Sequence, residues 1–121
     1  VDESFLDTPM DFDSLEKKGA NMVSGAIMVM NEDRSVFDML AEILEFFQHE
    51  SCGKCIPCRV GTTILARMIG EAKGQDNKRR LEIIGKMKSE AHYMQKNSLC
   101  ALGASLILPI RSVAGFFKEV Y

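Results

Sequence analysis

The sequence lacks several features that would place it in a membrane, in a secretory pathway or among dinucleotide-binding domains. No run of about 20 apolar residues occurs, which excludes a membrane-spanning helix. The opening segment, VDESFLDTPMDF, has neither a basic nor an apolar stretch, so we expect no signal peptide. The chain begins with Val1 instead of methionine, which suggests a fragment of a longer chain. No G-x-G-x-x-G loop is present.

Charge is distributed unevenly along the chain. The net charge is only −2. However, residues 1–50 carry 12 Asp and Glu against 3 Lys and Arg, whereas residues 51–121 carry 12 Lys and Arg against 5 Asp and Glu. The basic half contains every cysteine, so its charge either forms a solvated helical surface or offsets an anionic centre held by thiolates. Basic residues without interleaved aromatics argue against a nucleic-acid site.

Residues 1–34 are expected to be the end of a preceding β-containing domain. The segment DFDSLEKKG predicts a short helix that is capped by Asp11 or Asp13 and ends at Gly19. Residues 26–30, AIMVM, predict a short buried strand. Because one strand cannot stand alone, we expect it to complete a sheet whose other strands lie upstream.

Residues 35–121 are predicted to form an antiparallel four-helix bundle, so the fold class is mostly α. The first helix begins after Ser35, a favourable N-cap, and ends before the first cysteine. The second starts at Pro57 and stops at Gly74, the third starts near Lys78, and the fourth follows the last cysteine and is interrupted at Pro109. The apolar positions expected to face inward are Val36, Phe37, Leu40, Ala41, Leu44 and Phe47; Ile64, Leu65, Met68 and Ile69; Leu81, Ile84, Met87 or Lys88, Ala91 and Met94; and Ile110, Val113, Ala114 and Phe117.

The four cysteines have an informative spacing. Cys52, Cys55 and Cys58 lie in ESCGKCIPCRVGT, and Cys100 follows 41 intervening residues later in NSLCALG. A helical hairpin consumes about that many residues, so all four sulfurs are expected at one end of the bundle. Without a secretory signal, the thiols are better candidates for ligands or redox groups than for disulfides.

A Cys-x-x-Cys-x-x-Cys loop closed by one distant cysteine is typical of [4Fe–4S] ligation, with one thiolate on each iron. Gly53 allows the loop to curl, and Lys54 and Arg59 are placed to offset the negative charge of the site. A structural Cys₄ zinc module for subunit assembly is the main alternative, although such sites usually use two separated Cys-x-x-Cys pairs. Thiol redox chemistry or disulfides are a third reading. A nucleophilic cysteine would need a base, and His49 is the only candidate by sequence.

The two cysteine motifs resemble the C-terminal iron–sulfur domain of the flavin-bearing, NADH-oxidising subunit of respiratory complex I. Related NAD(P)-linked hydrogenase and formate dehydrogenase subunits contain the same module. The resemblance covers roughly residues 35–121. The preceding segment GANMVSGAIMVMNED, residues 19–33, is similar to the segment that joins that family's ubiquitin-like β-domain to the helical one, except that Val23 and Ala26 replace usual glycines. The matching residues are Glu50, Ser51, Cys52, Gly53, Cys55, Pro57, Cys58, Arg59, Gly61 and Thr62, then Ser98, Leu99, Cys100 and Gly103.

The resemblance implies a one-electron relay through a [4Fe–4S] cluster that accepts electrons from a reduced flavin. Its ligands would be Cys52, Cys55, Cys58 and Cys100, with Gly53, Lys54, Arg59 and Ser98 around them. FMN and NAD(P) would bind elsewhere in the parent subunit, so this chain alone would be no dehydrogenase. The implied partners are the flavin-binding domain of the same chain and other iron–sulfur subunits. The implied location is cytoplasmic, peripheral on the inner face of a membrane complex, and the parent enzyme stays open.

Overall fold

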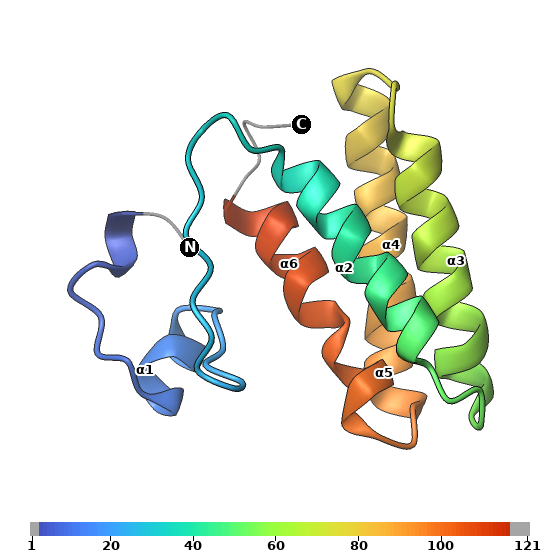
Figure 1. Ribbon diagram of the computed structural model, residues 1–121, viewed down its shortest axis with the longest axis horizontal. Coiled ribbons are helices and arrows are strands. Elements are labelled where there is room, and N and C mark those ends of the chain that lie inside the picture. The colour runs from blue at the N-terminus through green and yellow to red at the C-terminus, as the bar shows by residue number, and fades with distance from the viewer. Residues whose placement is uncertain (1–2, 117–121) are drawn as a thin grey trace. The chain divides into compact units, whose positions relative to one another are not determined.

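The computed structural model describes residues 3–116, and the fold is mostly helical (Figure 1). The chain divides into two compact units, Val1–Arg34 and Ser35–Tyr121. No helix among the described residues is long and apolar enough to cross a membrane.

The first unit contains the 3₁₀ turn η1 (Glu3–Phe5) and the short helix α1 (Phe12–Lys17). Of the two candidate caps, Asp11 is the one used, because its carboxylate accepts a hydrogen bond from the backbone N–H of Ser14 at 2.8 Å. Gly19 follows the helix with φ +83°, a conformation that glycine adopts without strain. The predicted helix and its stop are therefore confirmed.

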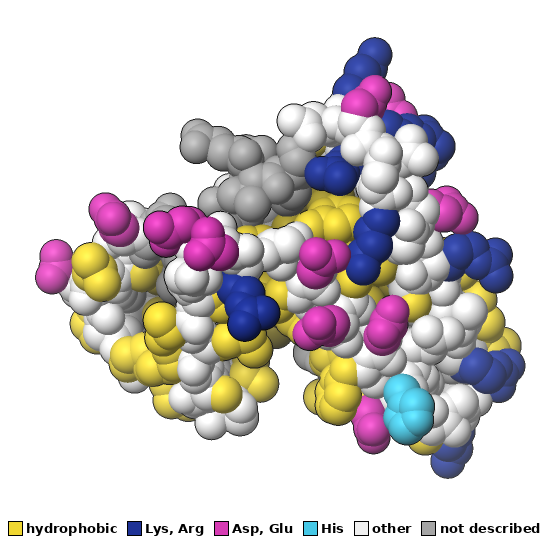
Figure 2. Space-filling model, turned by 45° about the horizontal axis from the view of Figure 1, so that its top comes forward, with side chains coloured by type: hydrophobic (Ala, Val, Ile, Leu, Met, Phe, Trp, Pro, Cys, Tyr) yellow, Lys and Arg dark blue, Asp and Glu magenta, His cyan; other side chains and the backbone are white. Residues whose placement is uncertain are grey.

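The strand expected at residues 26–30 does not form. These residues have no regular secondary structure, and no strand occurs within residues 3–116. Ile27, Met28 and Val29 are exposed, and apolar side chains gather on the surface of this unit (Figure 2). The physical reason is that a strand needs neighbouring strands for its backbone hydrogen bonds. The described part of this chain offers none.

The described part of the second unit, residues 35–116, is built from five helices. They are α2 (Val36–Glu50), α3 (Ile56–Ala72), α4 (Asn77–Asn97), α5 (Ala101–Ser105) and α6 (Ile107–Phe116). Ser35 caps α2 as expected, since its hydroxyl accepts the N–H of Asp38 at 3.1 Å. Successive contacts join α2 to α3, α3 to α4, α4 to α6 and α6 to α2, so the long helices enclose one core (Figure 1).

Most of the side chains predicted to face the core are buried. The exceptions lie at the margins of the apolar helix faces. Leu40, Leu65, Met87 and Ile110 are among the most completely buried side chains. The prediction is wrong for Ile64 and Leu81, because these side chains are 37% and 51% exposed. Ile83 takes the buried position on α4 instead. Phe117 lies outside the described residues.

The last helical segment breaks before Pro109 and not at it. The helix α5 ends at Ser105, Leu106 forms the junction, and α6 begins at Ile107. A proline ring clashes with the carbonyl four residues earlier and lacks the N–H that would bond to it. For Pro109 that carbonyl belongs to Ser105. Pro109 therefore sits in the first turn of α6, where its missing N–H costs nothing.

The charge asymmetry of the sequence has a structural counterpart in the second unit. Basic side chains are frequent along the edge of this unit formed by α3 and α4 (Figure 2). The helix α2 contributes Asp38, Glu42 and Glu45. The helix α4 carries six lysines and arginines against two glutamates.

Candidate metal centre

The helix ends bring the two cysteine motifs to one end of the second unit (Figure 1). The chain leaves α2 at Glu50, passes through the loop of residues 51–55 and enters α3. Cys55 is the N-cap of α3, and Cys58 lies in its first turn. The helix α4 returns the chain to this end, where Cys100 is the N-cap of α5. The expected convergence of loop, helix start and turn is therefore present.

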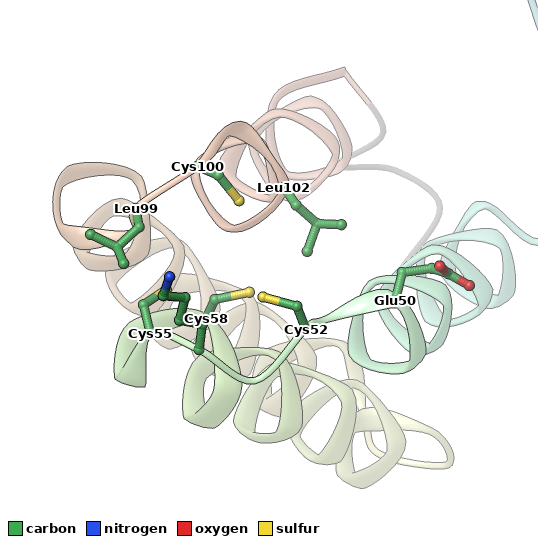
Figure 3. Close-up of a pocket in the computed structure, with 8 residues that line it drawn as sticks. Glu50, Cys52, Cys55, Cys58, Leu99, Cys100 and Leu102 are labelled. Atoms are coloured by element: carbon green, nitrogen blue, oxygen red, sulfur yellow. The ribbon is translucent and has the colours of Figure 1, made fainter.

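All four cysteines border one cavity of about 180 Å³. Figure 3 shows the sulfurs of Cys52 and Cys58 facing one another, with the sulfur of Cys100 directed towards the same space. Leu99 and Leu102 contribute apolar surface to the cavity, and the carboxylate of Glu50 points away from it (Figure 3). About 10–15 Å³ of such space holds one water. The cavity is thus large enough for a group of many atoms.

The thiols surround a space instead of meeting at a point. All four cysteines are free thiols. Among the residues that the structure describes, no three His, Cys, Asp or Glu side chains are grouped closely enough to hold a single metal ion. A tetrahedral zinc site would need sulfurs about 2.3 Å from one centre. The cavity that the four thiols border has room for a larger group that takes one thiolate at each of several metal atoms.

The loop between α2 and α3 is held by hydrogen bonds of its own. Gly53 has φ +75°, so the expected curl of the loop requires glycine at this position. The Gly53 N–H donates to Ser51 Oγ at 3.4 Å, and Arg59 Nη1 donates to the Gly53 carbonyl at 2.8 Å. These contacts fix the backbone that carries Cys52 and Cys55.

Cys55 links the two motifs. The backbone N–H of Leu99 is the largest influence that holds the pKa of the Cys55 thiol below its usual range, followed by the backbone N–H of Cys58. The positive charge of Arg59 acts in the same direction. Because hydrogen bonds to a thiolate favour the deprotonated form, Cys55 is prepared to act as a metal ligand.

Cys58 is the most enclosed of the four thiols, with 5% of its surface exposed. Thr62 Oγ1 donates to the Cys58 carbonyl at 2.8 Å and is itself buried. Gly103 packs directly against this region: a Cβ added there would lie 3.0 Å from Cys58 Cβ and 2.8 Å from Ser98 Cβ. Gly61 has a parallel role against α4, since an added Cβ would lie 2.8 Å from Met94 Cγ.

The remaining predicted site residues have distinct positions. Lys54 lines the cavity and is exposed. Arg59 is also exposed, with its guanidinium against the loop backbone. His49 is solvent-exposed beside Glu50, with Nδ1 3.4 Å from Oε1. The sequence did not reveal that the backbone N–H of Leu99 interacts with the Cys55 thiol, because nearly every residue type has a backbone N–H. Sequence reasoning also missed the hydroxyl of Ser51, although Ser51 belongs to the first motif.

The side chains around the cavity fit an iron–sulfur group by two observations. Four thiols of the preferred ligand type border one space. In addition, Ser98 Oγ is buried without a hydrogen-bond partner among the described residues. A buried hydroxyl in a native protein normally has a partner. Ser98 packs beside Cys58, which borders the cavity, so a group with sulfur acceptors held by Cys58 would bring acceptors near this hydroxyl.

Comparisons with known proteins agree with this chemistry. Residues 38–121 match the family described as the NADH-ubiquinone oxidoreductase-F iron-sulfur binding region. The chain is 33% identical over 118 residues to the F subunit of NADH-quinone oxidoreductase from Rickettsia akari (strain Hartford), an alignment that covers 97% of this chain and 27% of the relative. It is 34% identical over 111 residues to the F subunit from Rickettsia bellii (strain OSU 85-389), covering 91% of this chain and 26% of the relative.

The chain thus spans about a quarter of the length of the curated relatives it matches. The family description names an iron–sulfur centre, and the zinc alternative has no comparable support. Together, the four thiols at one cavity and the match over most of the helical unit lead to one assignment. The chain belongs to the NADH-ubiquinone oxidoreductase-F iron–sulfur binding family, the [4Fe–4S] domain of the flavoprotein subunit of complex I.

Proposed function

We propose that this chain relays single electrons through a [4Fe–4S] cluster whose ligands are Cys52, Cys55, Cys58 and Cys100. The observation that carries the proposal is the shared cavity bordered by these four thiols, which come from two segments far apart in the sequence. When bound, the cluster supplies a site that gains and loses one electron at a time. The protein residues position the thiolates, supply hydrogen bonds and limit solvent access.

The parent protein is proposed to be an NADH-oxidising subunit whose flavin delivers the electrons. The relatives are named as F subunits of NADH-quinone oxidoreductase, which supports this role. FMN and NAD(P) would bind to parts of the parent protein outside this chain, and the partners would be its flavin domain and other iron–sulfur subunits. We place the assembly peripherally at the inner, cytoplasmic face of a membrane complex.

We further propose that α2, α3, α4 and α6 constitute an antiparallel four-helix bundle that presents the cluster at one end. The closed series of helix contacts supports this arrangement. Residues 1–34 are proposed to belong to a preceding ubiquitin-like β-domain. The unsatisfied apolar surface of residues 26–30 is consistent with a strand whose partners lie elsewhere in the parent protein.

The test of this function is anaerobic reconstitution of the chain with iron and sulfide, with zinc supplied in a parallel sample. We expect about four irons per chain and a broad visible absorption band that bleaches with dithionite. The Cys100→Ala variant should lose or convert the cluster, because one iron loses its thiolate. The matched control is Ser105→Ala, since the Ser105 hydroxyl is already bonded to the Leu102 carbonyl at 3.2 Å.

Two results would count against the relay. A chain that takes up no iron but retains about one zinc would be a structural module. An unchanged four-iron spectrum in Cys100→Ala would remove Cys100 from the ligand set and leave the proposed site incomplete.

A further inference from the structure

Two hydroxyl groups from different motifs lie beside Cys58, which borders the cavity that the four thiols share. Ser51 Oγ is 3.3 Å from Cys58 Sγ. Ser98 lies beside Cys58 as well, because both side chains meet the same point above Gly103. Within the described residues, none of the other three cysteines has a hydroxyl within hydrogen-bond distance of its sulfur. Cys58 is therefore the cysteine beside which both hydroxyls lie, and Ser51 is the one already within hydrogen-bond distance of its sulfur.

The two serines are oriented by different parts of the chain. Ser51 is the C-cap of α2, and its oxygen also accepts the Gly53 N–H. A hydroxyl oxygen that accepts this N–H keeps its own hydrogen free to donate to sulfur. Ser98 is the C-cap of α4, and its N–H is bonded to the Met94 carbonyl. Both serines thus stand at helix ends, where their backbone N–H groups are hydrogen-bonded to the last turn of the helix.

Ser98 carries a second and independent observation. Its Oγ is buried and has no hydrogen-bond partner among the described residues. Leaving a hydroxyl buried and unpaired is unfavourable, so such a group needs an explanation. Gly103 keeps the space beside this oxygen open, since any added Cβ would press on Ser98. The second motif therefore preserves a hydroxyl that lacks an acceptor within residues 3–116.

We propose that Ser51 and Ser98 are positioning residues that donate hydrogen bonds to the sulfur atoms at Cys58 and thereby raise the reduction potential of the bound cluster. This inference rests on the proposed function and adds the residues that tune it. Reduction adds negative charge to the sulfurs, so a hydrogen-bond donor stabilises the reduced form more than the oxidised form. Burial of Cys58 strengthens the effect because water does not compete for the sulfur.

The test measures reduction potential and iron–sulfur stretching frequencies in the reconstituted chain. Ser51→Ala and Ser98→Ala should each favour the oxidised form about three- to tenfold, a lowering of about 28 to 59 mV for a one-electron couple. Loss of a hydrogen bond to sulfur should also raise the iron–thiolate stretching frequency in resonance Raman spectra. A role limited to folding would change iron occupancy or thermal stability without these two shifts.

Matched variants separate the hydroxyl from side-chain shape. Ser51→Thr keeps the hydroxyl. Ser51→Val introduces a side chain with nearly the shape of threonine but without the hydroxyl. We expect the threonine variant to keep a potential near that of the unmodified chain and the valine variant to fall with Ser51→Ala. Ser105→Ala is the control on α5, because its hydroxyl serves the Leu102 carbonyl.

The outcomes distinguish failure of this inference from failure of the proposed electron relay. If the unmodified chain binds no cluster, the proposed function fails and the inference fails with it. If the chain binds four irons but the alanine and valine variants keep its potential and stretching frequencies, the inference alone is overturned. Equal shifts in the threonine and valine variants would likewise overturn it, because shape and not the hydroxyl would be responsible.

Discussion

At the scale of single residues, the site depends on a few side chains whose roles differ although they are neighbours in sequence. Lys54 lines the cavity, whereas the guanidinium of Arg59 is bonded to the Gly53 carbonyl. Both side chains were expected to offset the negative charge of the metal site. The structure gives Arg59 a second task, the restraint of the loop, so Lys54 is the cleaner probe of electrostatics.

Replacing Lys54 with Ala is expected to lower the reduction potential, because removal of a positive charge destabilises the more negative reduced form. An exposed charge contributes about 0.2–1 kcal/mol, which corresponds to about 10–40 mV. Lys78→Ala is the control, since Lys78 lies in the first turn of α4, the end farther from the cysteines. That helix of 21 residues is about 30 Å long. Protein-film voltammetry would measure both, and an unchanged or raised potential in Lys54→Ala contradicts the role.

Gly61 and Gly70 lie in the same helix but have different surroundings. A Cβ at Gly61 would collide with the fully buried side chain of Met94, whereas nothing lies within 4 Å of the Gly70 position. Gly61→Ala should therefore lower the free energy of unfolding by about 1–3 kcal/mol. Gly70→Ala should raise it by up to about 1 kcal/mol through helix propensity. Urea unfolding of the two variants checks this, and equal effects would refute the close approach of α3 and α4.

At the scale of elements, helix ends carry the site and a proline divides the last helical segment. Cys55 and Cys100 are N-caps, so the ends of α3 and α5 position two of the four thiols. The break at Leu106 separates α5, which carries Gly103, from α6, which contributes Ile110 and Val113 to the core. Pro109 allows the two segments to serve the site and the core separately.

A proline deeper in α6 should be far more harmful than the natural one. Arg111→Pro is expected to cost about 3 kcal/mol or more, because it removes a hydrogen bond in the helix interior and introduces a steric clash. Pro109→Ala, the control, should change the free energy of unfolding by no more than about 1 kcal/mol. Circular dichroism during chemical unfolding measures both. Similar losses in the two variants would show that α6 does not begin where the structure has it.

At the scale of the whole molecule, the two units have different degrees of internal support. The core cluster lies entirely within the helical unit, whereas in residues 3–34 only Leu15 is a buried hydrophobic residue. Several apolar side chains of the first unit are exposed, including Leu6, Phe12 and Val29. The helical unit is thus the part with a hydrophobic core of its own.

Removal of residues 1–34 is therefore expected to leave folding and cluster uptake intact. The shortened chain should bind the same amount of iron and unfold within a few degrees of the full chain, because no residue of the core cluster is removed. Iron analysis and thermal unfolding would measure this. As a control for nonspecific effects of shortening, Leu15→Ala in the full chain should also leave iron uptake unchanged. Loss of iron binding on shortening would mean that the first unit supports the site.

Sequence patterns were sufficient for local features. Ser35 and Asp11 cap helices because their side chains can accept backbone N–H groups, and Gly19, Gly53 and Gly74 occupy positions with positive φ. The cysteine spacing alone predicted that the thiols would meet at one end of the helical unit. These features depend on interactions within a few residues or on the length of a helical hairpin. Both can be inferred from the sequence without a structure.

Other features were decided by tertiary structure alone. Periodicity could not reveal that Ile64 and Leu81 lie at the margin of the buried faces, because that depends on which neighbouring helix covers them. The strand at residues 26–30 failed to form because a strand depends on partners and not only on its own sequence. The contact between Ser51 and Cys58, the unpaired hydroxyl of Ser98 and the close packing at Gly103 arise where segments distant in sequence meet. The sequence by itself determined the ligand set expected at the site, whereas only the packing of the helix ends decided which thiol is enclosed and which hydroxyls lie beside it.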